Sequence, residues 1–354
     1  MMNKRLLIWG GITLGFFALG LSWGFWSREK EITSLSNGRP LRILCEEGWL
    51  NEDLLNRFAQ KYKVRVLHWT YSNPNEFLRQ MANSNGKIDV ICTNSVLLQS
   101  LVSSKWIRKW DYASLPNSRH ISVDFFNLPY DPKSEYSVPI FWNLYGFFGK
   151  GTDPSATVKQ TIQSKKVSIW GEELNMIHLL SHNGVHIDER LNDAENKSLE
   201  LDIQRFLKSL ARVELPVTAE ISAEAITSKV DWIQIPLAQV ARLLGETSPY
   251  HFWLPSDGGA VSVGVFAIGE LSENPELAAR LINELISTES ALEIHKRMGA
   301  AVVHTTLDYM DSIAPLQKAS SIRRFPLTQY TFPNISLDVI PRFQKYYSKL
   351  SSEN

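Results

Sequence analysis

The sequence lacks a surplus of charge of either sign, because its 37 lysine and arginine residues are matched by 37 aspartate and glutamate residues. Domains that bind nucleic acids normally carry a basic excess or a basic stripe, so the composition does not favour a nucleic-acid partner. Apolar residues make up 44% and charged residues 21% of the chain, which is ordinary for a globular protein. At 354 residues the chain exceeds what one hydrophobic core usually supports, so two domains are expected.

Catalytic and metal-binding signatures are also missing from the sequence. It has no phosphate-binding P-loop, no dinucleotide-binding glycine fingerprint, no nucleophile elbow, no specific pair of catalytic acids and no HExxH. His178 and His182 lie four residues apart on an expected helix, but His186 would lie beyond the helix end, so a solvent-facing helix end is favoured over a metal site. The sequence therefore predicts no catalytic residues, no cofactor and no metal.

One long hydrophobic run stands near the N-terminus. Lys4 and Arg5 precede an uncharged run from Leu6 to Trp26, which is long enough, at about 31 Å as a helix, to cross a bilayer. A membrane anchor fits this length better than a cleaved secretory signal, because the nearest cleavage site, Ala18-Leu19-Gly20, is poor. Both interpretations remain open.

Both interpretations predict that the body of the chain is exported. Residues 1–30 are expected to be a signal peptide or a membrane anchor, and residues 31–40 a linker rich in turn-forming residues. The expected location is the periplasmic or extracellular face, secreted or anchored to the cytoplasmic membrane through residues 6–26 if these are retained. No cysteine follows the run closely, so a lipid-modified cysteine anchor is not expected.

Alternating strand and helix patterns follow the linker. The pattern predicts strands at 41–47, 64–71 and 87–95, each followed by a helix, at 51–62, 73–86 and 95–106. This order is typical of an α/β protein whose parallel sheet carries helices on its faces. Ligands bind beyond the carboxyl ends of such strands, so the loops of interest are Glu46–Trp49, Thr70–Asn73 and Thr93–Ser95.

The segment SEYSVPIFWNLYGFFGK, residues 134–150, is the most apolar stretch in the body of the chain. It is too short to span a bilayer, and Pro139 argues against a long helix. The segment is therefore expected to be a strand. Later patterns predict short strands at 165–170 and 228–236, a turn at Gly258-Gly259 before another strand, and two helical pieces within 274–300.

The order and spacing of these segments resemble the extracellular solute-binding proteins of ABC importers, most closely the spermidine/putrescine-binding branch. The resemblance runs from about Leu41 to Leu350, and its markers are LLNRFAQKYKVRV, GKIDVICTNS, KWIRKWD, FFNLPYDPKSEYSVPIFWNLYGFFGK, FWLPSDGGAVSVGVFAIG and PELAARLINELISTESALEIHKRMG. It implies an α/β, two-lobe periplasmic-binding-protein-like fold of type II, with crossover strands at a hinge and an ABC permease as partner. On this resemblance the apolar segment 134–150 would contain the first crossover strand, which leaves one lobe and enters the other past a ligand cleft. The lobes would comprise residues 41–140 plus 261–305 and residues 141–260 plus 306–354.

Two loops of the first lobe depart from the family's polyamine binders. The family's first cleft loop carries a Trp-Thr-Glu-Tyr run, and its third-strand loop offers a Ser and a Tyr. The matching positions here are Glu46, Glu47, Gly48 and Trp49 in the first loop, and Thr93 and Ser95 in the third.

Further departures affect the residues that hold a ligand amine in that family. A Trp and an Asp after the Gly-Gly turn are matched by Ser262 and Gly264, and a late cleft Tyr is matched by Ala300. Of two acids near the first helix of the second lobe, one is matched by Glu173, with Glu172 beside it. The scaffold is thus retained while the amine cage is mostly lost, so a ligand other than spermidine is expected.

The resulting prediction is an exported solute-binding protein that captures a small polar or cationic solute by hinge closure and delivers it to the permease. Two alternatives remain: a membrane-tethered sensor or interaction module, and an enzyme that uses a cysteine in the cleft. The expected ligand-binding residues are Glu46, Glu47, Trp49, Thr93, Ser95, Trp142, Glu173 and Gln234. Because side chains alternate along a strand, Glu46 or Glu47 should face the cleft, and Glu46 is the more firmly fixed of the two.

The two cysteines, Cys45 and Cys92, lie at the ends of expected strands, which the family's sheet order makes neighbours. An exported context permits a disulfide, although bridges between adjacent parallel strands are often poorly aligned. A disulfide, two buried free thiols and a reactive thiol all remain open. The reactive thiol is considered because a thiamin-degrading enzyme with this fold uses a cleft cysteine, but no histidine or acid is obviously paired with Cys92.

Overall fold

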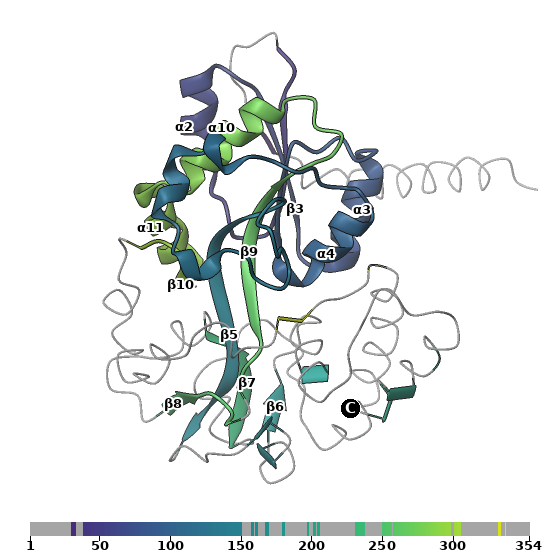
Figure 1. Ribbon diagram of the computed structural model, residues 1–354, viewed down its shortest axis with the longest axis vertical. Coiled ribbons are helices and arrows are strands. Elements are labelled where there is room, and N and C mark those ends of the chain that lie inside the picture. The colour runs from purple at the N-terminus through teal and green to yellow at the C-terminus, as the bar shows by residue number, and fades with distance from the viewer. Residues whose placement is uncertain are drawn as a thin grey trace, which may run out of the picture.

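The computed structural model describes residues 30–32, 38–150, 231–237, 250–256, 258–298 and 301–305, with short pieces or single positions within 157–205 and 332–337. The hydrophobic run Leu6–Trp26, the acids Glu172 and Glu173, and the histidines at 178, 182 and 186 lie outside the described residues. Figure 1 shows β5 and β9 running lengthwise between an upper part that carries the labelled helices and a lower part that contains β6, β7 and β8.

The first three strand–helix units form as the sequence predicts. They are β2 (Leu41–Glu46), α2 (Glu52–Tyr62), β3 (Val66–Tyr71), α3 (Pro74–Asn83), β4 (Val90–Asn94) and α4 (Ser95–Ser103). Strand β2 pairs in parallel with both β3 and β4, which confirms the parallel arrangement of this part of the sheet. The antiparallel edge strand β1 (Lys30–Ile32), at the start of the expected linker, was not anticipated.

Asparagine residues set the start of each of these helices. The side chains of Asn51, Asn73 and Asn94 accept hydrogen bonds from the backbone N–H groups of the first helical turns of α2, α3 and α4. Such caps satisfy donors that have no partner within the helix. The helices therefore begin within a few residues of the strand ends, and their N-termini lie near the carboxyl edge of the sheet.

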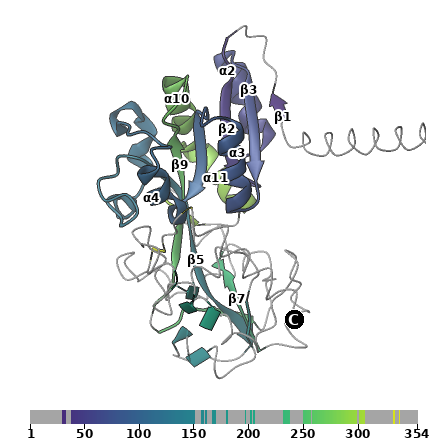
Figure 2. The same ribbon diagram turned by 90° about the vertical axis from the view of Figure 1, so that its right-hand side faces the viewer.

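Two long central strands join the parts of the sheet. Strand β9 (Val261–Ile268) pairs antiparallel with β4 on one side and with β5 (Val138–Lys150) on the other. The first part of β5 pairs with β9, whereas residues 145–150 pair with β7 (Trp232–Pro236) and β8 (Tyr250–Trp253). Figure 2 shows β5 passing from the helical part to the part that contains β7. The apolar segment is thus a strand shared by two sets of partners, as the sequence predicts.

The remaining described elements complete both ends of the sheet. Strand β6 (Val167–Ile169) pairs in parallel with β7, and the sheet order is β1-β3-β2-β4-β9-β5-β7-β6. Helices α10 (Pro275–Leu285) and α11 (Thr288–Met298) follow β9, and β10 (Ala301–Val302) then pairs with β5 at Phe141 and Trp142. Three short 3-10 helices, η1 (Tyr112–Ser114), η2 (Pro116–His120) and η3 (Val123–Phe125), precede β5 and were not anticipated.

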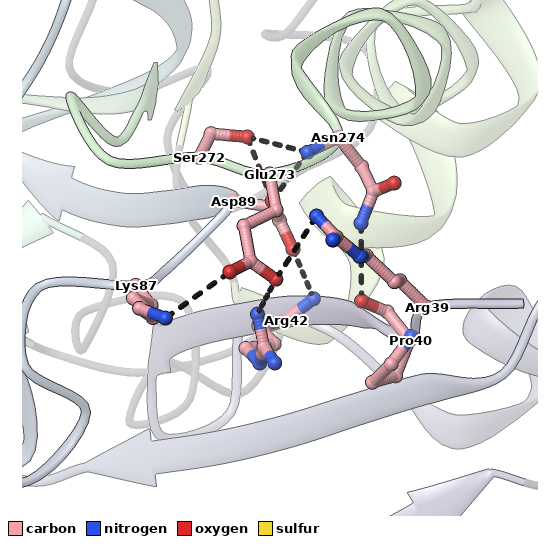
Figure 3. Close-up of polar contacts among 8 residues, drawn as sticks. All are labelled: Arg39, Pro40, Arg42, Lys87, Asp89, Ser272, Glu273 and Asn274. Atoms are coloured by element: carbon pink, nitrogen blue, oxygen red, sulfur yellow. Dashed lines mark hydrogen bonds and ion pairs between the residues drawn. The ribbon is translucent and has the colours of Figure 1, made fainter.

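A buried carboxylate fixes the amino ends of β2 and β4 to the start of α10 (Figure 3). Asp89 is fully buried, and its Oδ2 accepts a hydrogen bond from the Arg42 backbone N–H at 2.8 Å. Its Oδ1 accepts from the Ser272 hydroxyl at 2.7 Å and from the Asn274 backbone N–H at 3.0 Å. Asn274 precedes α10 without a side-chain cap of its own. Asp89, which directly precedes β4, therefore satisfies a backbone donor at the start of α10 from a distant part of the chain.

An outer layer of charge surrounds this contact (Figure 3). Glu273 lies 3.0 Å from the Arg42 guanidinium and 3.2 Å from the Lys87 ammonium. These hydrogen bonds, with Arg42 first and Lys87 second, lower the pKa of Glu273. The amino edge of the sheet is thus held by polar contacts, which leaves its carboxyl edge for the candidate site.

Within the part of the chain that the structure describes, no helix has the length and apolar character needed to cross a membrane. The same described residues contain no group of three or more His, Cys, Asp or Glu side chains arranged to hold a metal ion.

Candidate functional site

The loops expected to line the site come together at the carboxyl edge of the sheet. Glu46, the last residue of β2, is the register partner of Tyr71, the last residue of β3. The Glu47 backbone N–H donates to the Tyr71 carbonyl at 2.9 Å, which continues the pairing past the strand ends. On the other side of β4, Asn94 is opposite Gly264 of β9. Four strands therefore contribute to one edge.

The two acids of the first loop differ in environment. Glu46 is half-buried and Glu47 is exposed. The pKa of Tyr71 is raised well above its ordinary value, first by burial and then by the charge of Glu46, so the phenol stays neutral beside this carboxylate. The Tyr71 hydroxyl donates to the Cys92 carbonyl at 2.8 Å. The difference in exposure between Glu46 and Glu47 follows the alternation of side chains expected at a strand end.

Trp49 has a packing contact that the sequence did not reveal. It is 3% exposed, and its ring meets the Phe141 ring edge-on, with centroids 4.5 Å apart. Gly264 lies beneath the same Phe141 ring, since a Cβ at position 264 would approach ring atoms to 2.5–2.7 Å. Phe141 thus fills the space that a side chain at 264 would need. Trp49 therefore belongs to the hydrophobic core and packs beneath the carboxyl edge of the sheet.

Thr93 and Ser95, at the junction of β4 and α4, are both fully buried. The Ser95 hydroxyl accepts a hydrogen bond from the Val263 backbone N–H at 3.0 Å, which ties α4 to β9. The buried Thr93 hydroxyl has no hydrogen-bond partner among the described residues. In this structure Ser95 therefore holds neighbouring elements in place, and Thr93 is buried beside it.

Trp142 lies on β5 at the point where this strand changes partners. It is half-buried, and it pairs with Val263 of β9 on one side and with Ala301 of β10 on the other. Its ring centroid is 6.2 Å from that of Phe125 in η3. A change in the path of β5 would therefore move this indole.

Gln234 supplies a buried acceptor in the lower part. It lies on β7, is 4% exposed, and its Oε1 has no hydrogen-bond partner among the described residues. It lines a small pocket of about 10 Å³, roughly the room of one water molecule. The other lining residues are Tyr145, Gly146, Phe147, Val158, Leu179, Pro255, Gly259 and Ala260. A buried amide oxygen without a hydrogen-bond donor costs about 1–3 kcal/mol of stability. This position therefore favours a bound group that carries an N–H or O–H donor.

No protein-family model matches the chain. A spermidine/putrescine-binding periplasmic protein from Salmonella typhimurium is 24% identical over 260 residues, covering 70% of this chain and 72% of that protein. The protein of the same name from Escherichia coli is 23% identical over 262 residues, covering 70% of this chain and 72% of that protein.

Comparison with solved structures finds proteins of the same kind. The substrate-binding protein of a spermidine/putrescine ABC transporter from Streptococcus pneumoniae matches with a TM-score of 0.64 at 14% identity, covering 89% of this chain and 98% of that one. A lipoprotein from Treponema pallidum matches with a TM-score of 0.61 at 15% identity, covering 88% and 99%. The chain has the fold of a type II periplasmic binding protein. The fold class and the resemblance stated from the sequence are thereby confirmed.

Within this periplasmic-binding-protein fold, the expected site residues fall into three groups. Glu46, Glu47, Trp49, Thr93 and Ser95 gather at the carboxyl edge around β2 and β4. Trp142 lies on the connecting strand β5, and Gln234 on β7. Glu173 lies outside the described residues, so its place in the site stays a prediction.

Two residues of the edge were not named as site residues from the sequence, although Tyr71 lies in the loop of interest Thr70–Asn73. Tyr71 is the buried neighbour of Glu46, and Phe141 fills the space above Gly264. The signal for Tyr71 was its place at the end of an alternating strand. Phe141 gave no comparable signal, because its contacts join segments far apart in the chain.

Proposed function

We propose that this chain is an exported solute-binding protein that captures a small polar or cationic solute between two lobes and delivers it to an ABC permease. The observation that carries the proposal is the division of β5, which pairs with β9 through residue 144 and with β7 and β8 from residue 145 onward. A strand shared in this way is a suitable hinge, and hinge closure is the motion by which periplasmic binding proteins enclose ligands. The names of the periplasmic relatives support the same role.

The lobes in this proposal are residues 41–140 plus 261–305 and residues 141–260 plus 306–354. Strands β5 and β9 and the chain after β10 would cross between them. The N-terminal run, residues 6–26, would serve as the export signal or, if retained, as the membrane tether. Delivery to permease subunits would then occur at the outer face of the cytoplasmic membrane.

The ligand in this proposal carries one cationic or hydrogen-bond-donating group, and it differs from spermidine. Glu46 would supply a carboxylate from the upper edge, and Gln234 a neutral acceptor from β7. Gly264 offers no side chain, and Phe141 occupies the space above it, so a second carboxylate is missing where a long dication would need one. Glu47, Thr93, Ser95, Trp49, Trp142 and Glu173 would complete or support the binding surface.

Two observations disfavour the alternative of a cleft-cysteine enzyme. Cys92 is fully buried, whereas a nucleophile must reach its substrate. Its neighbour Cys45 has a pKa raised mainly by burial, so that thiol stays protonated. The curated relatives are also named as binding proteins.

A thermal-shift screen of the purified chain tests the proposal. The panel should contain polyamines, quaternary amines, amino acids, sugars and metal ions. A true ligand at 100 times its Kd should add about 2.7 kcal/mol of stability and raise the Tm. Gln234→Leu is the control variant, because it removes the buried acceptor while keeping an apolar side chain in the pocket. Absence of a shift with every class would contradict solute binding, and nanomolar binding of spermidine would contradict the ligand proposed here.

A further inference from the structure

The two cysteines of the chain lie directly opposite each other on neighbouring strands. Strands β2 and β4 pair in parallel, with Ile43 opposite Val90 and Leu44 opposite Ile91, so the next step in the register places Cys45 opposite Cys92. Residues that are opposite in a parallel ladder point to the same side of the sheet, and adjacent strands lie about 4.7–4.9 Å apart. That spacing falls inside the Cα separation of about 4.4–6.8 Å that disulfides require.

The two thiols are neighbours in the core and interact electrostatically. Both are free thiols in this structure and both are fully buried. Burial raises the pKa of Cys45 well above its ordinary value, and the neighbouring Cys92 thiol raises it further. Two fully buried thiols react slowly with external oxidants or reductants, because thiol exchange requires access to the sulfur. Any bridge must therefore form before the core closes, and it is protected afterwards.

We propose that the exported chain carries a disulfide between Cys45 and Cys92, which joins β2 to β4 beneath the candidate site. The inference rests on the proposed function, because export is what delivers the chain to an oxidising compartment. The oxidant is a disulfide-carrying thiol oxidoreductase that acts on the chain before folding is complete. One cysteine thiolate attacks the oxidoreductase disulfide to give a mixed disulfide, and the second thiolate then displaces the oxidoreductase. Two protons leave the cysteines, and two electrons reduce the oxidoreductase to its dithiol.

The bridge would act on the site through the next residue along each strand. Cys45 precedes Glu46, and Cys92 precedes Thr93. Linking the two sulfurs fixes the spacing of these strand ends and hence the position of the Glu46 carboxylate relative to α4. The loop that the bridge closes contains α2, β3 and α3, so it also restricts the unfolded chain.

Two thiol measurements test the inference and separate it from the proposed function. In the first, the full chain is unfolded, reduced and refolded in a glutathione redox buffer, and its free thiols are counted in denaturant. The expected result is no free thiol and a crosslinked pair of peptides, found by mass spectrometry without reduction. Two free thiols after refolding would overturn the bridge whatever the location of the protein.

In the second measurement, the full chain with its own N-terminus is produced in a bacterium with an oxidising periplasm, and thiols are alkylated in intact cells before lysis. A bridged chain supports the proposal as stated. A chain that bridges in the glutathione buffer but carries two free thiols in cells overturns export to an oxidising compartment, while its solute binding can still be measured separately by thermal shift.

A mutant cycle distinguishes a bridge from two packed thiols. All three variants, Cys45→Ser, Cys92→Ser and the double variant, should have the same Tm, because each lacks the same disulfide. This Tm should be at least about 5 °C below that of the unreduced wild type. Reductant present during refolding should lower the Tm of the wild type alone. Additive losses, with no effect of reductant on the wild type, would overturn the inference.

Discussion

At the residue scale, Glu46 is the carboxylate on which a cationic ligand would depend. Replacing it with Gln removes a half-buried negative charge but keeps the side-chain size. A charge-assisted contact contributes about 1–3 kcal/mol, so titration of the identified ligand should show a roughly tenfold or greater loss of affinity. Glu47→Gln is the matched control, because Glu47 is exposed one position along the chain. Unchanged or tighter binding in both variants would indicate a neutral or anionic ligand instead.

His304 makes the free energy of unfolding of the chain depend on pH. It is 5% exposed and stacks on His120, with ring centroids 4.9 Å apart. Burial, followed by the charge of His120, lowers the pKa of His304 below its ordinary value of 6.5. The unfolded chain therefore binds this proton more readily than the folded chain does, so the free energy of unfolding falls as the pH drops below about 6.5.

Denaturant unfolding at a series of pH values measures this effect. The midpoint for the wild type should fall between pH 7.5 and pH 5, and His304→Gln should show a smaller fall. The depressed pKa values of Glu273 and Glu293 act only at lower pH, since their ordinary value is 4.5. If the denaturant midpoints of the wild type and of His304→Gln fall equally between pH 7.5 and pH 5, the pH dependence arises at residues other than His304.

Single-residue environments were predictable where they follow from local geometry. The half-buried Glu46 and the exposed Glu47 follow from the alternation of side chains at a strand end. The burial of Trp49 does not, because its partner Phe141 comes from β5, far along the chain. A tryptophan after a strand is compatible with a ligand face and with a core, and only the tertiary contact separates the two.

At the element scale, the close packing of β9 on β5 makes a prediction about Gly264. A methyl group at this position would come within 2.5–2.7 Å of the Phe141 ring. Gly264→Ala should therefore destabilise the chain by about 1–3 kcal/mol through overpacking, as measured by denaturant unfolding. In a Phe141→Ala background the same change should cost little, because the ring is gone. If Gly264→Ala lowers the free energy of unfolding equally in the wild type and in Phe141→Ala, the loss arises from the backbone of β9 and not from the Phe141 ring.

Elements defined by neighbouring residues were predicted well, and those defined by distant partners were not. The three strand–helix units depend on asparagine caps and apolar periodicity, which are visible in short windows. The place of β9 between β4 and β5 depends on contacts across most of the chain. The sequence predicted a strand there but not its position in the sheet, because periodicity gives no strand order. The 3-10 helices before β5 lack any periodic pattern of apolar residues, so they had no signal.

At the scale of the whole molecule, the division of β5 between two sets of partners predicts closure on binding. Residues 138–144 pair with β9, whereas residues 145–150 pair with β7 and β8 and would move with them. The register shift between Pro139 and Phe141 interrupts the regular ladder near this change of partners. β10 also pairs with β5 at Phe141 and Trp142. Bending near these residues would change the angle between the two parts without breaking the pairing on either side of the bend.

Small-angle scattering with and without a saturating ligand measures this closure. The radius of gyration of the chain without residues 1–30 should decrease towards the value of about 20 Å expected for a compact chain of this size. Gln234→Leu, at the same ligand concentration, should keep the larger radius, because it lacks the acceptor contributed by the lower part. An unchanged radius in a wild-type sample whose binding has been verified by titration would mean that the two parts are already closed. The solute would then enter without movement of β5, and the hinge proposed for this strand would be wrong.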